Sequence, residues 1–151
     1  MTRGERIVVA ARDAVGTRFR AQGRGARGLD CIGLVALSLR AGGYVGAVRA
    51  GYALRSGDAA RVSDELSAAG LRRVRVVKPG DVVVSASGPG QLHLGIATGT
   101  GTVHADAMLR RVVERPGEPV GDVIAAWRLG GARKVGVVAP RLLSPAGRGR
   151  G

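Results

Sequence analysis

The chain has 151 residues, enough for one domain with a buried core, and its single cysteine excludes an internal disulfide. Hydrophobic residues are 45% of the sequence but aromatic residues only 3%, so the core must be built from Val, Leu, Ile and Ala. The net charge of +13 would suit an anionic partner, but the arginines are scattered and no aromatic residues lie among them to stack on bases. The composition therefore argues against nucleic acid as a partner.

The N-terminal residues predict an amphipathic helix that ends near Gly16, because Ile7, Val8, Ala11 and Val15 fall on one stripe at helical spacing. This apolar stretch is too short for a secretory signal. No run in the sequence approaches the ~20 apolar residues of a membrane span. We therefore expect a chain that is made in the cytoplasm without a signal peptide and has no membrane span.

A second helix is predicted over residues 31–40, after a loop rich in glycine and arginine at residues 20–29. Asp30 is the expected N-cap, because its carboxylate can accept the unpaired N–H groups of the first turn. Gly42 and Gly43 supply the stop signal at the other end.

The middle of the chain changes from helical to strand patterning. Residues 44–57 carry no clear signal, and Asp58 is then predicted to cap a short helix that runs to Ala69. The turn at Lys78–Asp81 introduces a series of strands. The predicted strands are Val82–Val84, Gln91–Thr98, Gly101–Ala105, Arg111–Glu114, Ile124–Leu129 and Val135–Val138.

This order of elements predicts an α+β fold, in which the N-terminal helices pack on one face of a mostly antiparallel sheet. We place the domain at residues 1–138. Residues 139–151 are basic and poor in large apolar side chains, so we expect a disordered C-terminal tail there.

Cys31 directly follows the predicted N-cap. Unpaired backbone N–H groups at a helix start stabilise a thiolate, which would lower the pKa of Cys31 and make it nucleophilic. The same groups can donate to an oxyanion, so the oxyanion region is assigned to the backbone around Asp30 and Cys31. Gly33 would keep the first turn uncluttered. The alternative is a buried structural cysteine.

His93 is the candidate base, and hairpin register connects it to two further polar residues. If Gly99 and Thr100 form a two-residue turn, Gly95 faces His104 and His93 faces Asp106 on one side of the hairpin. Either His104 or Asp106 could then orient the His93 ring. A three-residue turn would send His104 to the opposite face.

Together these residues provide the parts of a thiol hydrolase: a nucleophile, Cys31, a base, His93, and an orienting group, His104 or Asp106. A zinc site made by Cys31, His93 and His104 is the rival interpretation. Close ligand spacing is missing and no fourth ligand stands out, so we expect neither a metal nor another cofactor.

Five segments, in this order, resemble motifs of the NlpC-type peptidases, papain-like cysteine enzymes of bacterial cell-wall turnover. The resemblance extends over residues 7–129. The matching segments are Val15–Phe19, Leu29–Leu34, Lys78–Val82, His93–Ile96 and Val103–Ala105.

The resemblance implies a papain-like fold and hydrolysis of amide bonds in peptidoglycan stem peptides, often next to γ-linked D-glutamate. Cys31 would be the nucleophile, His93 the base and His104 the third polar residue. The form of the nucleophile motif, GLDCIGL at residues 28–34, with Gln22–Arg24 shortly before it, is most similar to short versions encoded by phages and gene-transfer agents. Such a protein would have phage-like tail proteins as partners and would reach the cell wall in a particle.

One departure concerns Phe19, where many members of this family carry a tyrosine that helps to hold the oxyanion. Phenylalanine cannot donate a hydrogen bond. A catalytically weak or inactive structural tail component with the same fold is therefore the main alternative. Acyl transfer at the same site and a basic nucleic-acid-binding module are further alternatives.

Overall fold

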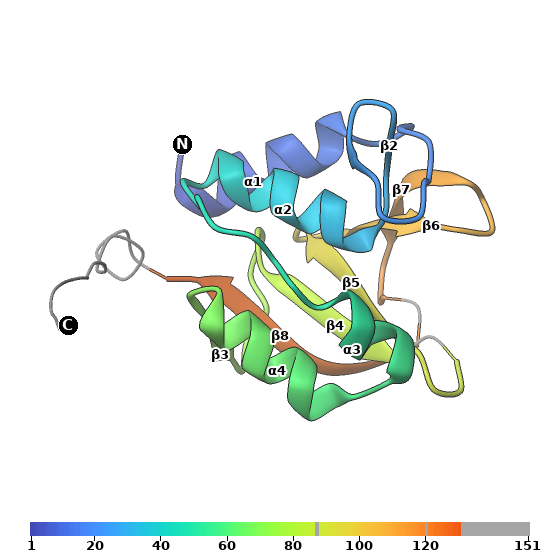
Figure 1. Cartoon of the computed structure of the whole chain (residues 1–151). Helices are drawn as coiled ribbons and strands as arrows, with labels where there is room; N and C mark the ends of the chain where they lie inside the picture. The colour runs from blue at the N-terminus through green and yellow to red at the C-terminus, as the bar shows by residue number, and fades with distance from the viewer. Residues whose placement is uncertain (87, 120, 131–151) are drawn as a thin grey trace, which may run out of the picture.

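The computed structural model describes residues 1–86, 88–119 and 121–130. It confirms the predicted α+β class, with helices packed on an antiparallel sheet (Figure 1). Six strands form this sheet in the order β3-β8-β4-β5-β6-β7, and every neighbouring pair is antiparallel. The helices are α1 (Arg3–Asp13), α2 (Cys31–Ala41), α3 (Gly51–Ser56) and α4 (Ala59–Ala68). The strands of the sheet are β3 (Leu71–Val74), β4 (Val82–Ala86), β5 (Leu92–Ala97), β6 (Gly101–Asp106), β7 (Arg111–Pro116) and β8 (Asp122–Leu129).

The three helices predicted from their end signals are present. A Thr2–Glu5 capping box begins α1. The Asp30 carboxylate accepts the N–H of Gly33 at 2.8 Å and begins α2, and Asp58 begins α4 in the same way. The prediction for Val15 was wrong, because α1 ends at Asp13 and the Val15 side chain is exposed.

Four elements were not predicted. The loop at residues 20–29 contains a small hairpin of β1 (Arg24–Gly25) and β2 (Gly28–Leu29). The helix α3 has no side-chain cap, and β3 carries two arginines at its centre, so neither shows a local signal. The predicted strand at residues 135–138 and the predicted tail at 139–151 lie outside the described residues.

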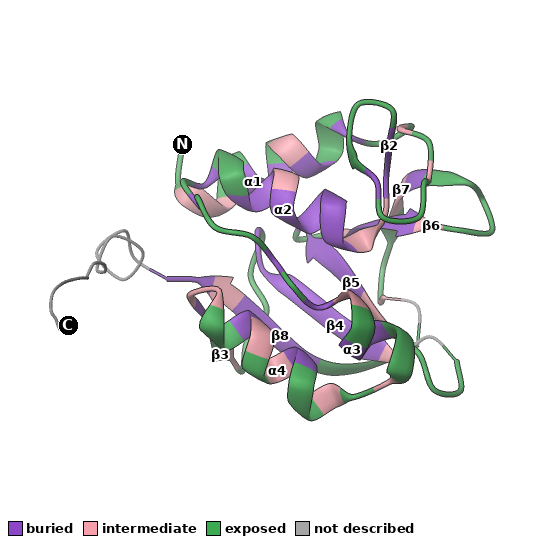
Figure 2. Cartoon of the chain, viewed as in Figure 1, coloured by how far each residue is buried: buried purple, intermediate pink, exposed green. Residues whose placement is uncertain are grey.

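One hydrophobic core fills the space between the helices and the sheet (Figure 2). The register Val82↔Ile96 and Val84↔Leu94 puts these four side chains on one face of the sheet. The core residues on the strands of this six-stranded sheet share that face, and residues of all four helices pack against them. None of these helices is long and apolar enough to cross a membrane.

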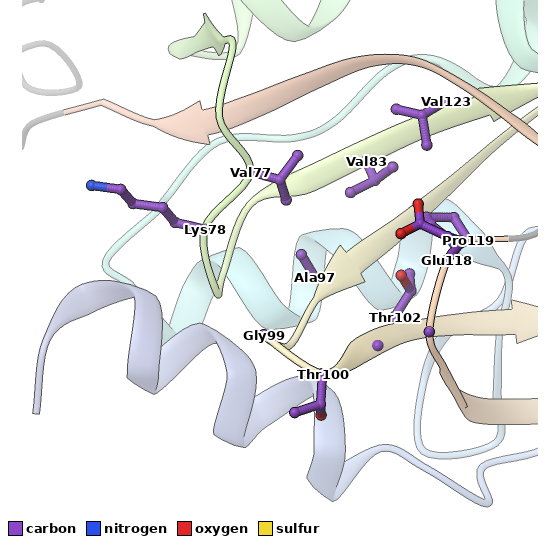
Figure 3. A pocket seen from close by; sticks show the side chains of 12 residues that line it. Val77, Lys78, Val83, Ala97, Gly99, Thr100, Thr102, Glu118, Pro119 and Val123 are labelled. Atoms are coloured by element: carbon purple, nitrogen blue, oxygen red, sulfur yellow. The ribbon is translucent and has the colours of Figure 1, made fainter.

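The other face of the sheet also buries some residues, but these do not belong to the main core. Buried Val83 and Ala97 lie there, outside the main core. A cavity of about 370 Å³ opens over them, bordered by Val77, Glu118 and Pro119 (Figure 3). The helix-covered face and this back face are therefore chemically distinct, and the predicted nucleophile belongs to the helix-covered one.

Gly33 packs the first turn of α2 directly against the loop at residues 20–29. A Cβ atom at Gly33 would lie 2.1 Å from the carbonyl oxygen of Gly23. That same carbonyl accepts the N–H of Asp30 at 3.3 Å. The missing side chain at Gly33 therefore lets the loop approach the helix, and the loop in turn borders the predicted nucleophile.

Replacing Gly33 with alanine should lower the free energy of unfolding by about 1–3 kcal/mol, because the backbone of Gly23 must move. Alanine's better helix propensity offsets only about 1 kcal/mol of this cost. Gly25→Ala is the matched control, since no heavy atom lies within 4 Å of its Cβ position. Denaturant unfolding of both variants measures the difference, and equal stability would contradict the close contact.

Candidate active site

Cys31 and His93 line one cavity of about 420 Å³, although they lie 62 positions apart in the chain. Cys31 is the first residue of α2, and His93 is the second residue of β5. No hydrogen bond joins the thiol to the imidazole ring in the described part of the chain. The structure thus brings the predicted nucleophile and base to one space without a direct contact between them.

The Asp30 carboxylate holds the cavity wall next to Cys31. Its Oδ1 atom accepts from Gly33 N and from the Arg24 guanidinium at 2.7 Å, and its Oδ2 atom accepts from Gln22 N at 2.9 Å. Both oxygens are therefore already used within the protein. Asp30 thus acts on the site by fixing the backbone around Cys31 and not as a free acid or base.

Burial dominates the ionisation of the thiol. Part of the Cys31 residue reaches the surface, but burial of its sulfur raises the pKa of Cys31 to about 11. Backbone hydrogen bonding from Leu94 and Ile32 favours the thiolate and partly opposes this rise in the pKa of Cys31. The prediction of a lowered thiol pKa was wrong for the resting protein, because loss of solvation outweighs the helix end.

His93 contacts His104 as the hairpin register predicted. Thr98 N donates to Gly101 O at 2.9 Å, which confirms the two-residue turn. The Nε2 atom of His93 then lies 3.1 Å from Nδ1 of His104, with the two rings nearly perpendicular at 84°. This bond occupies Nε2, so Nδ1 is the nitrogen of His93 left to take a proton from Cys31.

Asp106, the alternative orienting residue, binds elsewhere. Its Oδ1 atom accepts the N–H groups of Met108 and Leu109 at 2.9 Å each, which closes the turn between β6 and β7. Of the two candidates, His104 is therefore the one that contacts the His93 ring. Burial lowers the pKa of both histidines, and the charge of Asp106 opposes only part of that lowering.

Both histidines are neutral at physiological pH. Burial, and to a smaller extent the proximity of His104, lowers the pKa of His93 to about 4. Burial also lowers the pKa of His104. The resting site thus holds a neutral thiol and two neutral imidazoles, one of which donates a hydrogen bond to the other.

Phe19 lies on the cavity wall at the position that the sequence comparison singled out. Its backbone bridges to Leu29, and its N–H donates to Arg110 O at 2.9 Å. The side chain brings only an apolar ring to the cavity. Phe19 therefore cannot donate a hydrogen bond to an oxyanion formed in this cavity, as a tyrosine at the same position could.

Sequence reasoning missed the part of the cavity contributed by α3. Gly51, Leu54 and Arg55 line the cavity, and Gln91 borders it just before β5. No local pattern in residues 44–57 pointed to this cavity, because that stretch carries no clear secondary-structure signal.

The zinc interpretation finds no support in the described residues, which contain no group of three or more His, Cys, Asp or Glu side chains placed to bind a metal ion. His93 uses one ring nitrogen for His104. The predicted ligand set therefore does not converge on one point.

No model of a known protein family matches this chain, and no curated protein matches its sequence. Solved structures do match. The NlpC/p60 domain of the peptidoglycan hydrolase SagA has a TM-score of 0.54 and 25% sequence identity, over 75% of this chain and 88% of that chain. The fold is that of NlpC/p60 domains.

Two further structures support this assignment of the fold. NlpC2 from Trichomonas vaginalis has a TM-score of 0.62 and 16% identity, over 85% of this chain and 47% of that chain. The peptidoglycan hydrolase RipB from Mycobacterium tuberculosis has a TM-score of 0.57 and 22% identity, over 84% of this chain and 64% of that chain. This chain thus spans less than two thirds of either protein. The NlpC/p60 neighbours support the family resemblance drawn from the sequence motifs.

The lowered pKa of His93 predicts acid sensitivity. Between its unperturbed pKa of 6.5 and its folded pKa of about 4, the unfolded chain binds more protons than the folded one. Stability should therefore be complete above pH 6.5 and fall by up to about 1.4 kcal/mol per pH unit towards pH 4. His93→Gln keeps a polar partner for His104 but should flatten this slope. Denaturant unfolding at pH 7.0, 5.5 and 4.5 measures it, and parallel profiles for both proteins would contradict the assignment.

Proposed function

We propose that this protein is a cysteine hydrolase that cleaves amide bonds in peptidoglycan stem peptides. The observation that carries the proposal is the shared cavity of Cys31 and His93, with the His93 ring held by His104. Similar folds occur in proteins described as peptidoglycan hydrolases, which supports the cell wall as the substrate.

In the proposed reaction, Nδ1 of His93 takes the thiol proton as Cys31 attacks the amide carbonyl carbon. The C–S bond forms and the carbonyl oxygen becomes an oxyanion. The C–N bond then breaks, and the imidazolium returns its proton to the leaving amine. Water, deprotonated by His93, finally hydrolyses the thioester and regenerates the thiol.

His104 is a positioning residue in this scheme. Its bond to Nε2 fixes the ring orientation of His93 and selects the tautomer, so that Nδ1 can accept the thiol proton. In this tautomer the neutral His93 already carries Nε2–H, which donates to Nδ1 of His104, and the bond is kept when Nδ1 becomes protonated. The imidazolium is thereby stabilised at the moment when the buried site would otherwise disfavour it.

The oxyanion must be held by the start of α2. The N–H of Gly33 is taken by Asp30, which leaves the N–H groups of Cys31 and Ile32 as donors in the first turn. They lie at the positive end of the helix dipole, where a developing negative charge is favoured.

We further propose that the enzyme acts as a phage-tail or gene-transfer-agent peptidase, carried to the wall in a particle with tail proteins as partners. The segment Gln22–Arg24, which supports this subgroup, has a definite structural role here. Gln22 N and the Arg24 guanidinium both bind Asp30 beside the nucleophile.

Cys31→Ala should abolish release of stem-peptide fragments from purified peptidoglycan. His104→Gln should lower kcat roughly 100-fold, since it affects the base only through its orientation. Asp106→Asn, which keeps the Oδ1 acceptor for Met108 and Leu109, is the matched control and should lower kcat far less. Equal fragment release by the wild type and Cys31→Ala would rule out this mechanism.

Phe19 and the raised thiol pKa favour one alternative, a structural component of low activity. Phe19→Tyr distinguishes the two functions, because it adds a donor at the cavity wall without removing apolar contact. If the site is a working but weakened hydrolase, kcat should rise by roughly 10-fold or more. If neither protein releases fragments, the structural function is supported.

A further inference from the structure

The cavity around Cys31 carries one cation whose charge is not already balanced. Of its lining residues, Asp30 is paired with Arg24 at 2.7 Å, and the lowered pKa of His93 keeps that ring neutral. Arg55 lines the same cavity and is exposed to solvent. It forms no ion pair with any residue in the described part of the chain. A substrate entering the cavity therefore meets a net positive charge.

Arg55 lies close to the start of α2 because Gly51 has no side chain to keep its guanidinium away. The Nη1 atom of Arg55 lies 3.2 Å from the point where a Cβ of Gly51 would stand, and Cδ1 of Ile32 lies 3.4 Å from that same point. The guanidinium thus rests over the bare backbone of Gly51, beside the first turn of α2. Cys31 begins that turn.

The other end of α3 is fixed to the strand that carries the base. Gly57 ends the helix with a left-handed φ of +71°, and its Cβ position lies 2.9 Å from the carbonyl group of Gly90. Gly90 belongs to the loop that leads into β5 and His93 (Figure 1). The helix that carries Arg55 therefore lies between the start of α2, where Cys31 is, and the loop before β5, the strand that carries His93.

We infer that Arg55 is a specificity-determining residue that binds a free carboxylate of the peptide substrate next to the scissile amide. This inference rests on the proposed function. A guanidinium matches a carboxylate with two parallel N–H···O bonds, whereas a carboxamide offers one oxygen and no charge. Arg55 therefore selects stem peptides with a free α-carboxylate over their amidated forms.

Binding to the Cys31→Ala protein tests this separately from turnover. The probes are L-Ala-γ-D-Glu-L-Lys with a free D-Glu α-carboxylate and the same peptide with a carboxamide there. Adding Arg55→Gln should weaken binding of the free acid roughly tenfold, and that of the amide less than about twofold. Arg55→Lys should recover part of the loss through its point charge. Calorimetry measures all of these dissociation constants.

Arg61→Gln is the matched control, because the Arg61 guanidinium lies 5.4 Å from the centre of the Tyr52 ring and outside the cavity lining. It should leave both dissociation constants unchanged. Raised salt should weaken binding of the free acid to the Arg55 protein and hardly affect the Arg55→Gln protein.

An equal loss of affinity for both peptides, or no loss for either, would overturn the inference, as would failure of the Cys31→Ala protein to bind either one. Release of cleaved peptide is measured separately, on proteins that keep Cys31. Selective binding through Arg55 without product release would contradict the proposed hydrolysis and leave the inference standing. Cleavage without discrimination at Arg55 would contradict the inference alone.

Discussion

The Asp30 carboxylate joins the start of α2 to the loop in front of it, and the position of the nucleophile depends on this junction. Its two oxygens accept from Gly33, Gln22 and Arg24, so helix and loop share one set of hydrogen bonds. Gly33 allows the loop backbone to lie directly on the helix. Cys31 is thereby presented to the cavity by backbone capping, while the core below fixes only the direction of the helix.

Burial shapes the chemistry of the site as strongly as this capping does. The same loss of solvent raises the pKa of Cys31 to about 11 and lowers the pKa of His93 to about 4, so neither group is charged at rest. A neutral thiol reacts poorly with electrophiles. The proposed reaction must therefore create charge where burial disfavours it. The His93–His104 bond and the first-turn N–H groups supply the stabilisation at that point.

The parts of the fold that follow from short-range chemistry could be read from the sequence. Asp30 and Asp58 cap helices through bonds to residues three positions away. The turn at Gly99 fixes the register that brings His93 to His104. The thiol pKa could not be read in this way, because a sequence shows that Cys31 begins a helix but not how deeply the fold buries its sulfur.

The elements that escaped prediction are those that depend on distant partners. In α3, six residues without a side-chain cap are held by the contact of Gly57 with the Gly90 backbone and by the buried Leu54. Such a helix has no stable form alone. Yet it supplies the cavity wall that faces a substrate, including Arg55. In the proposed hydrolase, the candidate catalytic residues thus lie in segments with strong local signals, whereas the inferred selectivity residue lies in a segment whose position only the tertiary structure determines.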